Sequence, residues 1–151
     1  MKKALLILIT LLCCIPLSGC FNKNIEGPLE EIMTKVYASI PEDEKPMMLT
    51  NIEITEENVE SFLGTSDIEF EEALASESAT GSIAHSVILL RVKNGANVEV
   101  IEETLEDSIN PRKWICVEAE EVEIDSRGNL ILIVMSTEKT ADKIVAEFYK
   151  L

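Results

Sequence analysis

Basic residues and histidine are scarce in this sequence. It contains 13 Lys and Arg against 28 Asp and Glu, which gives a formal net charge of −15. Proteins that hold nucleic acid by its phosphates need clusters of basic side chains, so we exclude nucleic acid as a partner. The sequence has one histidine, His85, whereas zinc sites are usually built from several histidines and cysteines. We therefore expect no metal site.

The sequence also lacks a hydrophobic run long enough to span a membrane. The longest run, residues 4–15, is too short to cross about 30 Å of hydrocarbon as a helix. It follows Met1-Lys2-Lys3 and precedes Leu17-Ser18-Gly19-Cys20. A charged start, a short apolar segment and small residues before a cysteine predict a secretory signal rather than a transmembrane helix.

The segment Leu17-Ser18-Gly19-Cys20 resembles the lipobox of bacterial lipoproteins. In that family a diacylglyceryl group is attached to the cysteine sulfur, and a signal peptidase then cleaves before the cysteine. The resemblance implies that residues 1–19 are a lipoprotein signal peptide, cut between Gly19 and Cys20. Lipidated Cys20 would then anchor the chain on the extracytoplasmic face of the cell membrane, where two or more acyl chains hold stably. Two alternatives stay open: an ordinary secretory signal with Cys20 left as a free thiol, and an uncleaved anchor.

Few cysteines remain after this processing. The two cysteines of the apolar run leave with the signal, Cys20 carries the lipid, and Cys116 is the remaining thiol. No disulfide can then form within the mature chain. Residues 20–27 are the lipidated cysteine and a short tether, and residues 28–151 suffice for a single domain but not for two. We expect no cofactor other than the covalent lipid on Cys20.

Hydrophobic periodicity predicts the secondary structure. Apolar stripes at helical spacing predict helices at residues 29–40, 55–63, 96–108 and 137–148. Thr55 is the expected N-cap of the second helix and Gly64 its stop signal. Alternating or continuous apolar residues predict strands at residues 51–54, 83–93, 118–125 and 130–135, with a bulge or new strand start at Glu120-Glu121.

One segment, residues 65–82, has no clear periodicity. It is rich in Glu, Ser, Ala and Thr and fits either a solvated helix around residues 69–75 or a mobile excursion. In the 83–93 strand one face is apolar, while the other includes His85 and Arg91 and is expected to be partly covered. The 130–135 strand is apolar throughout, which favours a central position in a sheet.

These elements predict an α+β fold. From residue 83 onward their order is β-α-β-β-α, preceded by N-terminal helices. The simplest arrangement of these elements is a mainly antiparallel sheet of three to five strands packed against helices on one face.

Three segments carry a second resemblance. Residues 82–92, 110–120 and 128–136 are similar to those of a family of uncharacterised lipoprotein domains common in clostridia and their relatives. The similarity covers roughly Pro28 to Tyr149. It implies a small α+β domain on the outer face of a bacterial membrane, and because the family has no known function it implies no reaction.

A catalytic site is not evident. Cys116 and His85, with Arg91 or Arg112, are the ingredients of a sortase-like transpeptidase. Nothing in their spacing requires that chemistry, and a cysteine beside Trp114 is typical of a small buried hydrophobe. We assign no catalytic residue.

Two polar segments of the sequence are candidate binding sites. The acids of residues 118–125 lack the calcium-binding loop pattern, so we interpret them as a solvated face that keeps the protein soluble. Arg112, Lys113 and Trp114 form the one basic and aromatic cluster of the chain. It is our candidate interaction site, although a solitary tryptophan after a helix more often fills a core.

These observations leave two hypotheses for function. The first is a non-enzymatic binding module that contacts the membrane through acylated Cys20 and an unknown envelope protein or ligand through its domain. It predicts that Cys116 resists alkylation. The alternative is a surface cysteine enzyme, a sortase-like transpeptidase or hydrolase, using Cys116 and His85; a thiol that reacts fast at acidic pH would favour it. A solute receptor with two closing lobes would need a longer chain. The ligand, the oligomeric state and the number of membranes in the host stay open.

Overall fold

The computed structural model describes residues 23–151, so the predicted signal peptide, the predicted lipobox and Cys20 lie outside the described residues. The elements are α1 (Leu29–Val36), β1 (Leu49–Glu53), α2 (Val59–Leu63), β2 (Phe70–Ser78), β3 (Ser86–Val92), α3 (Val98–Ser108), β4 (Glu121–Arg127), β5 (Leu130–Ser136) and α4 (Glu138–Phe148). The predicted β-α-β-β-α order is confirmed by β3-α3-β4-β5-α4. None of the helices within residues 23–151 is both long and apolar enough to cross a membrane.

The five strands form one antiparallel sheet in the order β1-β2-β3-β5-β4. The predicted α+β class is therefore confirmed. All seven residues of β5 are buried, and β5 lies inside the sheet between β3 and β4, as its apolar sequence predicted. The predicted start of a new strand at Glu120-Glu121 is also confirmed, because β4 begins at Glu121.

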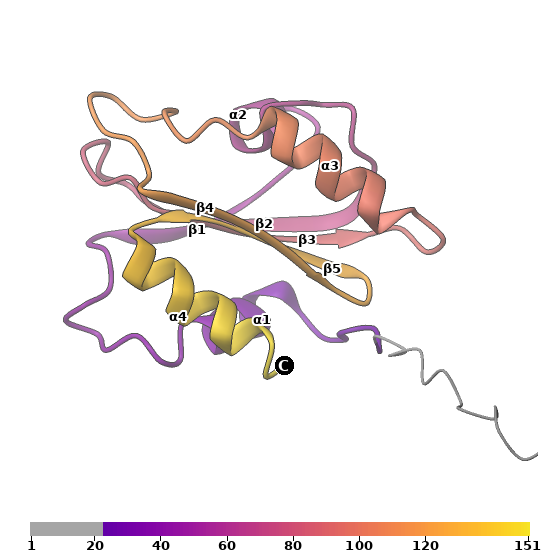
Figure 1. The fold of residues 1–151 in the computed structure, drawn as a ribbon, viewed down its shortest axis with the longest axis horizontal. Helices are drawn as coiled ribbons and strands as arrows, with labels where there is room; N and C mark the ends of the chain where they lie inside the picture. The colour runs from indigo at the N-terminus through magenta and orange to yellow at the C-terminus, as the bar shows by residue number, and fades with distance from the viewer. Residues whose placement is uncertain (1–22) are drawn as a thin grey trace, which may run out of the picture.

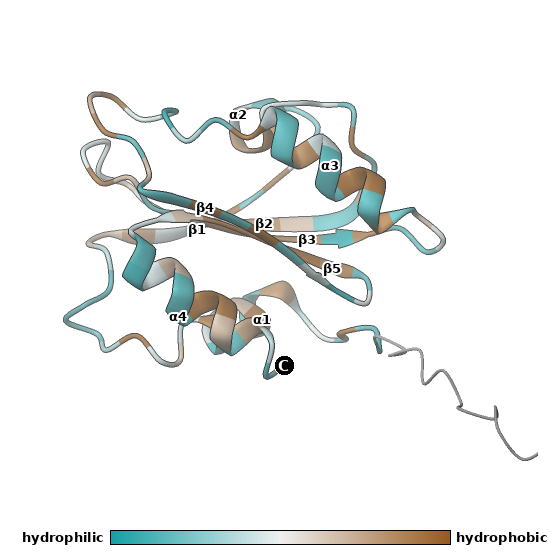
Figure 2. Ribbon diagram, in the orientation of Figure 1, coloured by the Kyte–Doolittle hydropathy of each residue, from teal (hydrophilic) through white to brown (hydrophobic). Residues whose placement is uncertain are grey.

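Helices cover both faces of the sheet rather than one. Figure 1 shows α1 and α4 on one side and α2 and α3 on the other. The expectation of a single covered face was wrong because β3 is apolar on both of its faces. Val87 and Leu89 pack in the core with α1 and α4, while Ile88 and Leu90 pack in the core with α2 and α3. In Figure 2 the middle strands are mainly hydrophobic, whereas the helices carry both hydrophobic and hydrophilic residues.

Residues 65–82 contain a strand, which neither expectation for this segment had foreseen. β2 occupies Phe70–Ser78 and pairs with β1 on one side and β3 on the other. Its centre, Ala73 to Ser76, is buried. The strand forms because its neighbours supply hydrogen-bond partners on both sides, although acidic residues and alanine have low strand propensity.

The short helix α2 differs from its prediction at one end only. It begins at Val59, with Asn58 rather than Thr55 at the N-cap position. The backbone N–H of Thr55 instead donates to the Asn58 side chain at 2.7 Å. At the other end Gly64 stops the helix as predicted, with a left-handed φ of 74° that glycine adopts without strain.

Candidate functional site

The sheet has two ends. One, which we call the loop end, is formed by residues 37–48, 79–85 and 110–120. The opposite end, which we call the hairpin end, carries the turns at residues 93–97 and 128–129. In Figure 1 the loop end is on the left and the hairpin end on the right. Most of the residues that the sequence singled out lie at the loop end.

His85 lies at the loop end but is inaccessible. Its Nε2 is 2.7 Å from the hydroxyl of Tyr37, and its Nδ1 is 2.8 Å from Oγ of Ser136. The side chain is only 1% exposed. This burial lowers the pKa of His85 from 6.5 to about 4 and raises the pKa of Tyr37. His85 is therefore neutral at pH 7, with both ring nitrogens engaged by neighbours.

Lys113 points inward and forms a shielded ion pair. Its ammonium group contacts the carboxylate of Glu77, and the two side chains are 14% and 16% exposed. The ammonium also lies 5.0 Å from the ring centroid of Phe62 and 5.3 Å from that of Trp114, which is cation–π geometry. Trp114 is half-buried against the core below α3, as expected of a residue that fills a core.

Arg112 points outward, away from these neighbours. Its guanidinium pairs with Glu118 at 3.1 Å, and both side chains are exposed. With Trp114 and Cys116 these two residues line a shallow depression of about 230 Å³. Arg112, Lys113 and Trp114 are therefore adjacent in the chain but have three different environments.

Cys116 is exposed, so the expectation of a small buried hydrophobe was wrong. The thiol is exposed because Cys116 lies in an irregular loop rather than in a strand, with a left-handed φ of 67°. In the described part of the chain no hydrogen bond joins Cys116 to His85. The two residues of the alternative catalytic hypothesis are thus not assembled into a pair.

Large apolar side chains are exposed at the loop end. Ile115 is 80% exposed, Met47 69% and Met48 65%. Met48 resembles Cys116 in having a left-handed φ, of 55°. The sequence analysis did not predict the exposure of these three residues. For Met47 and Met48 it could have been predicted, because they directly follow Pro46 in a polar loop.

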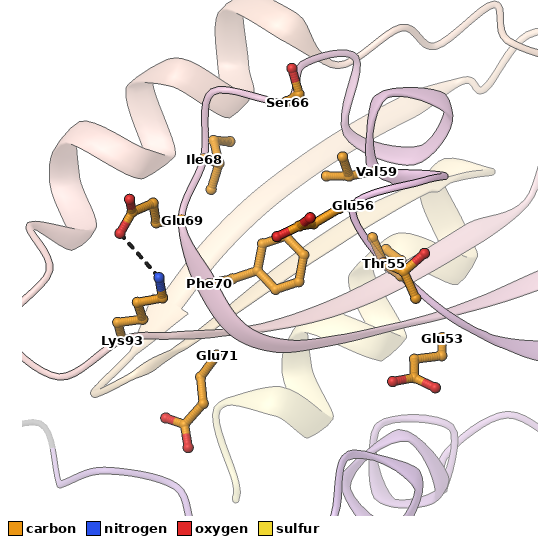
Figure 3. Close-up of a pocket in the computed structure, with 11 residues that line it drawn as sticks. Glu53, Thr55, Glu56, Val59, Ser66, Ile68, Glu69, Phe70, Glu71 and Lys93 are labelled. Carbon is orange, nitrogen blue, oxygen red and sulfur yellow. Dashed lines mark hydrogen bonds and ion pairs between the residues drawn. The ribbon is translucent and has the colours of Figure 1, made fainter.

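A cleft of about 560 Å³ opens between the end of β1 and the start of β2 (Figure 3). Its apolar lining residues are Ile54, Val59, Ile68 and Phe70, and its acidic ones are Glu53, Glu56, Glu69 and Glu71. Lys93 is the one basic residue of the lining and pairs with Glu69 at 3.1 Å. The cleft therefore combines apolar side chains with an excess of negative charge.

The acids of β4 form a strip on the α4 side of the sheet. Burial, and then the nearby charges of Glu121, Asp125 and Asp142, raise the pKa of the Glu123 carboxyl. Within residues 23–151 no group of three or more histidine, cysteine or acidic side chains is placed to hold a metal ion.

Comparisons with protein-family models, with curated proteins and with solved structures gave no match.

Proposed function

We propose that the chain is a bacterial lipoprotein, anchored by lipid on Cys20 to the extracytoplasmic face of the cell membrane. Its α+β domain acts as a non-enzymatic binding module for a protein of the envelope. The loop end is the contact surface. The signal and lipobox pattern of residues 1–20 supports the anchor.

The observation that carries the binding proposal is the exposure of Met47, Met48 and Ile115. Single exposed apolar residues are common on protein surfaces. Here, however, three of the five large apolar side chains exposed within residues 23–151 lie in loops of one end. Loops held by a rigid scaffold are frequent binding elements, and methionine is among the residue types enriched at protein interfaces. We therefore expect the partner to present an apolar patch to these side chains.

A non-enzymatic role is supported by the surroundings of His85 and Cys116. A general base must reach the proton that it removes, whereas His85 is buried and bonded to Tyr37 and Ser136. A catalytic thiol needs a base or a cation beside it. Within residues 23–151 no hydrogen bond joins Cys116 to such a group, and Arg112, which lines the same depression, is paired with Glu118.

Site-specific photocrosslinking in intact cells tests the proposal. A photoreactive residue replaces Ile115 in one strain and Val100 in a matched control, because Val100 is also aliphatic and exposed but lies on α3. We expect one reproducible adduct from position 115 and none from position 100. The purified partner should then bind the wild-type domain and bind Ile115→Asp at least tenfold more weakly, a loss of about 1.4 kcal/mol. Equal crosslinking from both positions contradicts the proposal.

The cleft of Figure 3 favours a second candidate function, the binding of a cationic ligand with an apolar body. A lysine-rich peptide with apolar residues is a suitable probe. Its affinity should fall steeply as salt is added, because the exposed carboxylates act through a screened field. Glu56→Gln, with Glu106→Gln on α3 as the control, should weaken binding only if the cleft is the site.

A further inference from the structure

Residues 23–27, which precede α1, are held against the sheet rather than free. The buried side chain of Arg91, on β3, reaches across to them. Its Nη2 donates to the carbonyl oxygen of Gly27 at 2.6 Å, and its Nη1 contacts the carbonyl oxygen of Ile25. Nε of Arg91 pairs with Glu72 at 2.7 Å, so the guanidinium is fixed by β2 while it binds the tether.

The β4–β5 hairpin holds the same segment from another side. The backbone N–H of Ile25 donates to Oδ1 of Asn129 at 3.1 Å, and the Ile25 side chain packs against the core of α1 and α4. A Cβ on Gly128 would lie 2.7 Å from the carbonyl oxygen of Lys23 and 2.8 Å from Cα of Asn24. The backbone of the tether therefore crosses the turn at a distance that only glycine permits. We call these contacts of residues 23–27 with Arg91, Gly128 and Asn129 the tether clasp.

The clasp shortens the effective linker to the membrane. Lys23 is three positions after Cys20, and a chain extends by at most about 3.6 Å per residue. Lys23 can thus lie no more than roughly 11 Å from Cα of Cys20, whereas one headgroup layer of a bilayer is about 5–8 Å thick. A tether that was free up to Gly27 would reach more than twice as far and would let the domain rotate.

We infer that the hairpin end of the domain faces the lipid headgroups and that the loop end projects away from the bilayer. This inference rests on the proposed lipid anchor at Cys20. The strands run between the two ends, and the seven residues of β3 extend roughly 20 Å. The loop end, with Met47, Met48 and Ile115, is thereby presented to partners at a fixed height above the membrane.

The orientation can be measured with two thiol labels. Cys116, the one cysteine after Cys20, takes a fluorophore at the loop end. In a second sample, Cys116→Ser with Glu99→Cys takes the same fluorophore in the exposed first turn of α3, beside the hairpin end and clear of the clasp. The full-length lipidated protein is inserted in vesicles that carry a short-range nitroxide quencher on their headgroups. With the two ends roughly 20 Å apart, we expect quenching at position 99 to exceed quenching at position 116 at least about twofold.

A matched pair of variants tests whether the clasp sets this orientation. Gly128 and Gly95 both have left-handed φ values, of 60° and 83°. Asparagine tolerates that conformation, but at position 128 it collides with the tether, whereas at position 95 a Cβ meets no atom within 4 Å. We expect Gly128→Asn to bring the quenching at the two labels close to equality and Gly95→Asn to leave the difference unchanged.

The outcomes separate the inference from the anchor proposal. Intact mass of the purified protein reports the lipid on Cys20 independently of any label, so its absence overturns both proposals. If the lipid is present and the two labels are quenched equally in the wild-type chain, or more strongly at position 116, the orientation is wrong while the anchor stands. If Gly128→Asn keeps the wild-type difference, the clasp does not set the orientation.

Discussion

The hydroxyl of Tyr37 lies 2.7 Å from Nε2 of His85, which joins the chain just after α1 to the chain just before β3. The other ring nitrogen of His85 continues the connection to Ser136 at the end of β5. A neutral imidazole has one donor and one acceptor nitrogen, so His85 donates one of these bonds and accepts the other. Protonation would turn both nitrogens into donors inside an apolar layer.

This relationship predicts a loss of stability in acid. The folded-state pKa of His85 is lowered to about 4 from 6.5, so its contribution is complete above pH 6.5 and is lost as the pH falls toward 4. The loss is of order 3 kcal/mol, because a tenfold change in proton affinity corresponds to about 1.4 kcal/mol. Urea denaturation at pH 7, 5.5 and 4 measures it.

Carboxylates also titrate as the pH falls toward 4. The effect of His85 is therefore separated from theirs by comparing the wild-type protein with His85→Gln. This variant keeps a polar side chain but does not titrate. We expect its stability to fall less than that of the wild-type protein between pH 7 and 4, and the difference isolates His85. Parallel curves for the two proteins would show that His85 has an ordinary pKa.

The ion pair between Lys113 and Glu77 should be a major contact of the loop end. Because the pair is largely shielded from solvent, Glu77→Ala leaves an uncompensated ammonium and should cost of order 3 kcal/mol. The double variant Lys113→Met with Glu77→Leu should recover most of that loss, because no charge is then buried. The control is Arg112→Met, whose exposed partner Glu118 makes the expected cost less than about 1 kcal/mol. A loss as small as this for Glu77→Ala would contradict the shielded pair.

Gly64 should be the glycine least tolerant of substitution. Its φ is 74°, and a Cβ there would overlap the carbonyl oxygen of Ser108 at the end of α3. Gly64→Ala combines left-handed strain of about 1–2 kcal/mol with overpacking of about 1–3 kcal/mol. Gly95→Ala has a similar φ and open space, so it should cost only the strain. Thermal unfolding of both variants tests the difference, and equal melting temperatures would exclude the collision.

The sequence predicted the elements whose apolar pattern is strong and missed the one whose pattern is weak. β3 and β5 carry large apolar residues, so their strands and burial could be predicted. β2 could not, because Ala73 and Ala75 are too small to mark a period and acidic residues surround them. Its structure depends on pairing with β1 and β3, which is a property of the folded chain.

The site was predictable only in part, for a related reason. Arg112, Lys113 and Trp114 could be located as neighbours in a loop, but the inward direction of Lys113 depends on Glu77 and Phe62, which lie far away in the sequence. The contacts of His85 span 48 and 51 positions, and no local pattern encodes them. Exposure of Cys116 follows from its backbone conformation, which composition does not report.

Glu123 should destabilise the protein at neutral pH. Its pKa is raised by burial and by the neighbouring charges of Glu121, Asp125 and Asp142, so ionisation is less favourable in the folded chain than in the unfolded one. Glu123→Gln should therefore increase stability at pH 7, by at most about 1 kcal/mol given the screening of partly exposed charges. The gain should vanish as the pH falls below the ordinary value of 4.5, since both states are then protonated. Glu57→Gln, in an exposed turn, changes the net charge equally and controls for the general repulsion of an acidic protein. Equal gains from the two variants, or a gain at Glu123 that persists below pH 4.5, would show that the β4 strip has no specific effect.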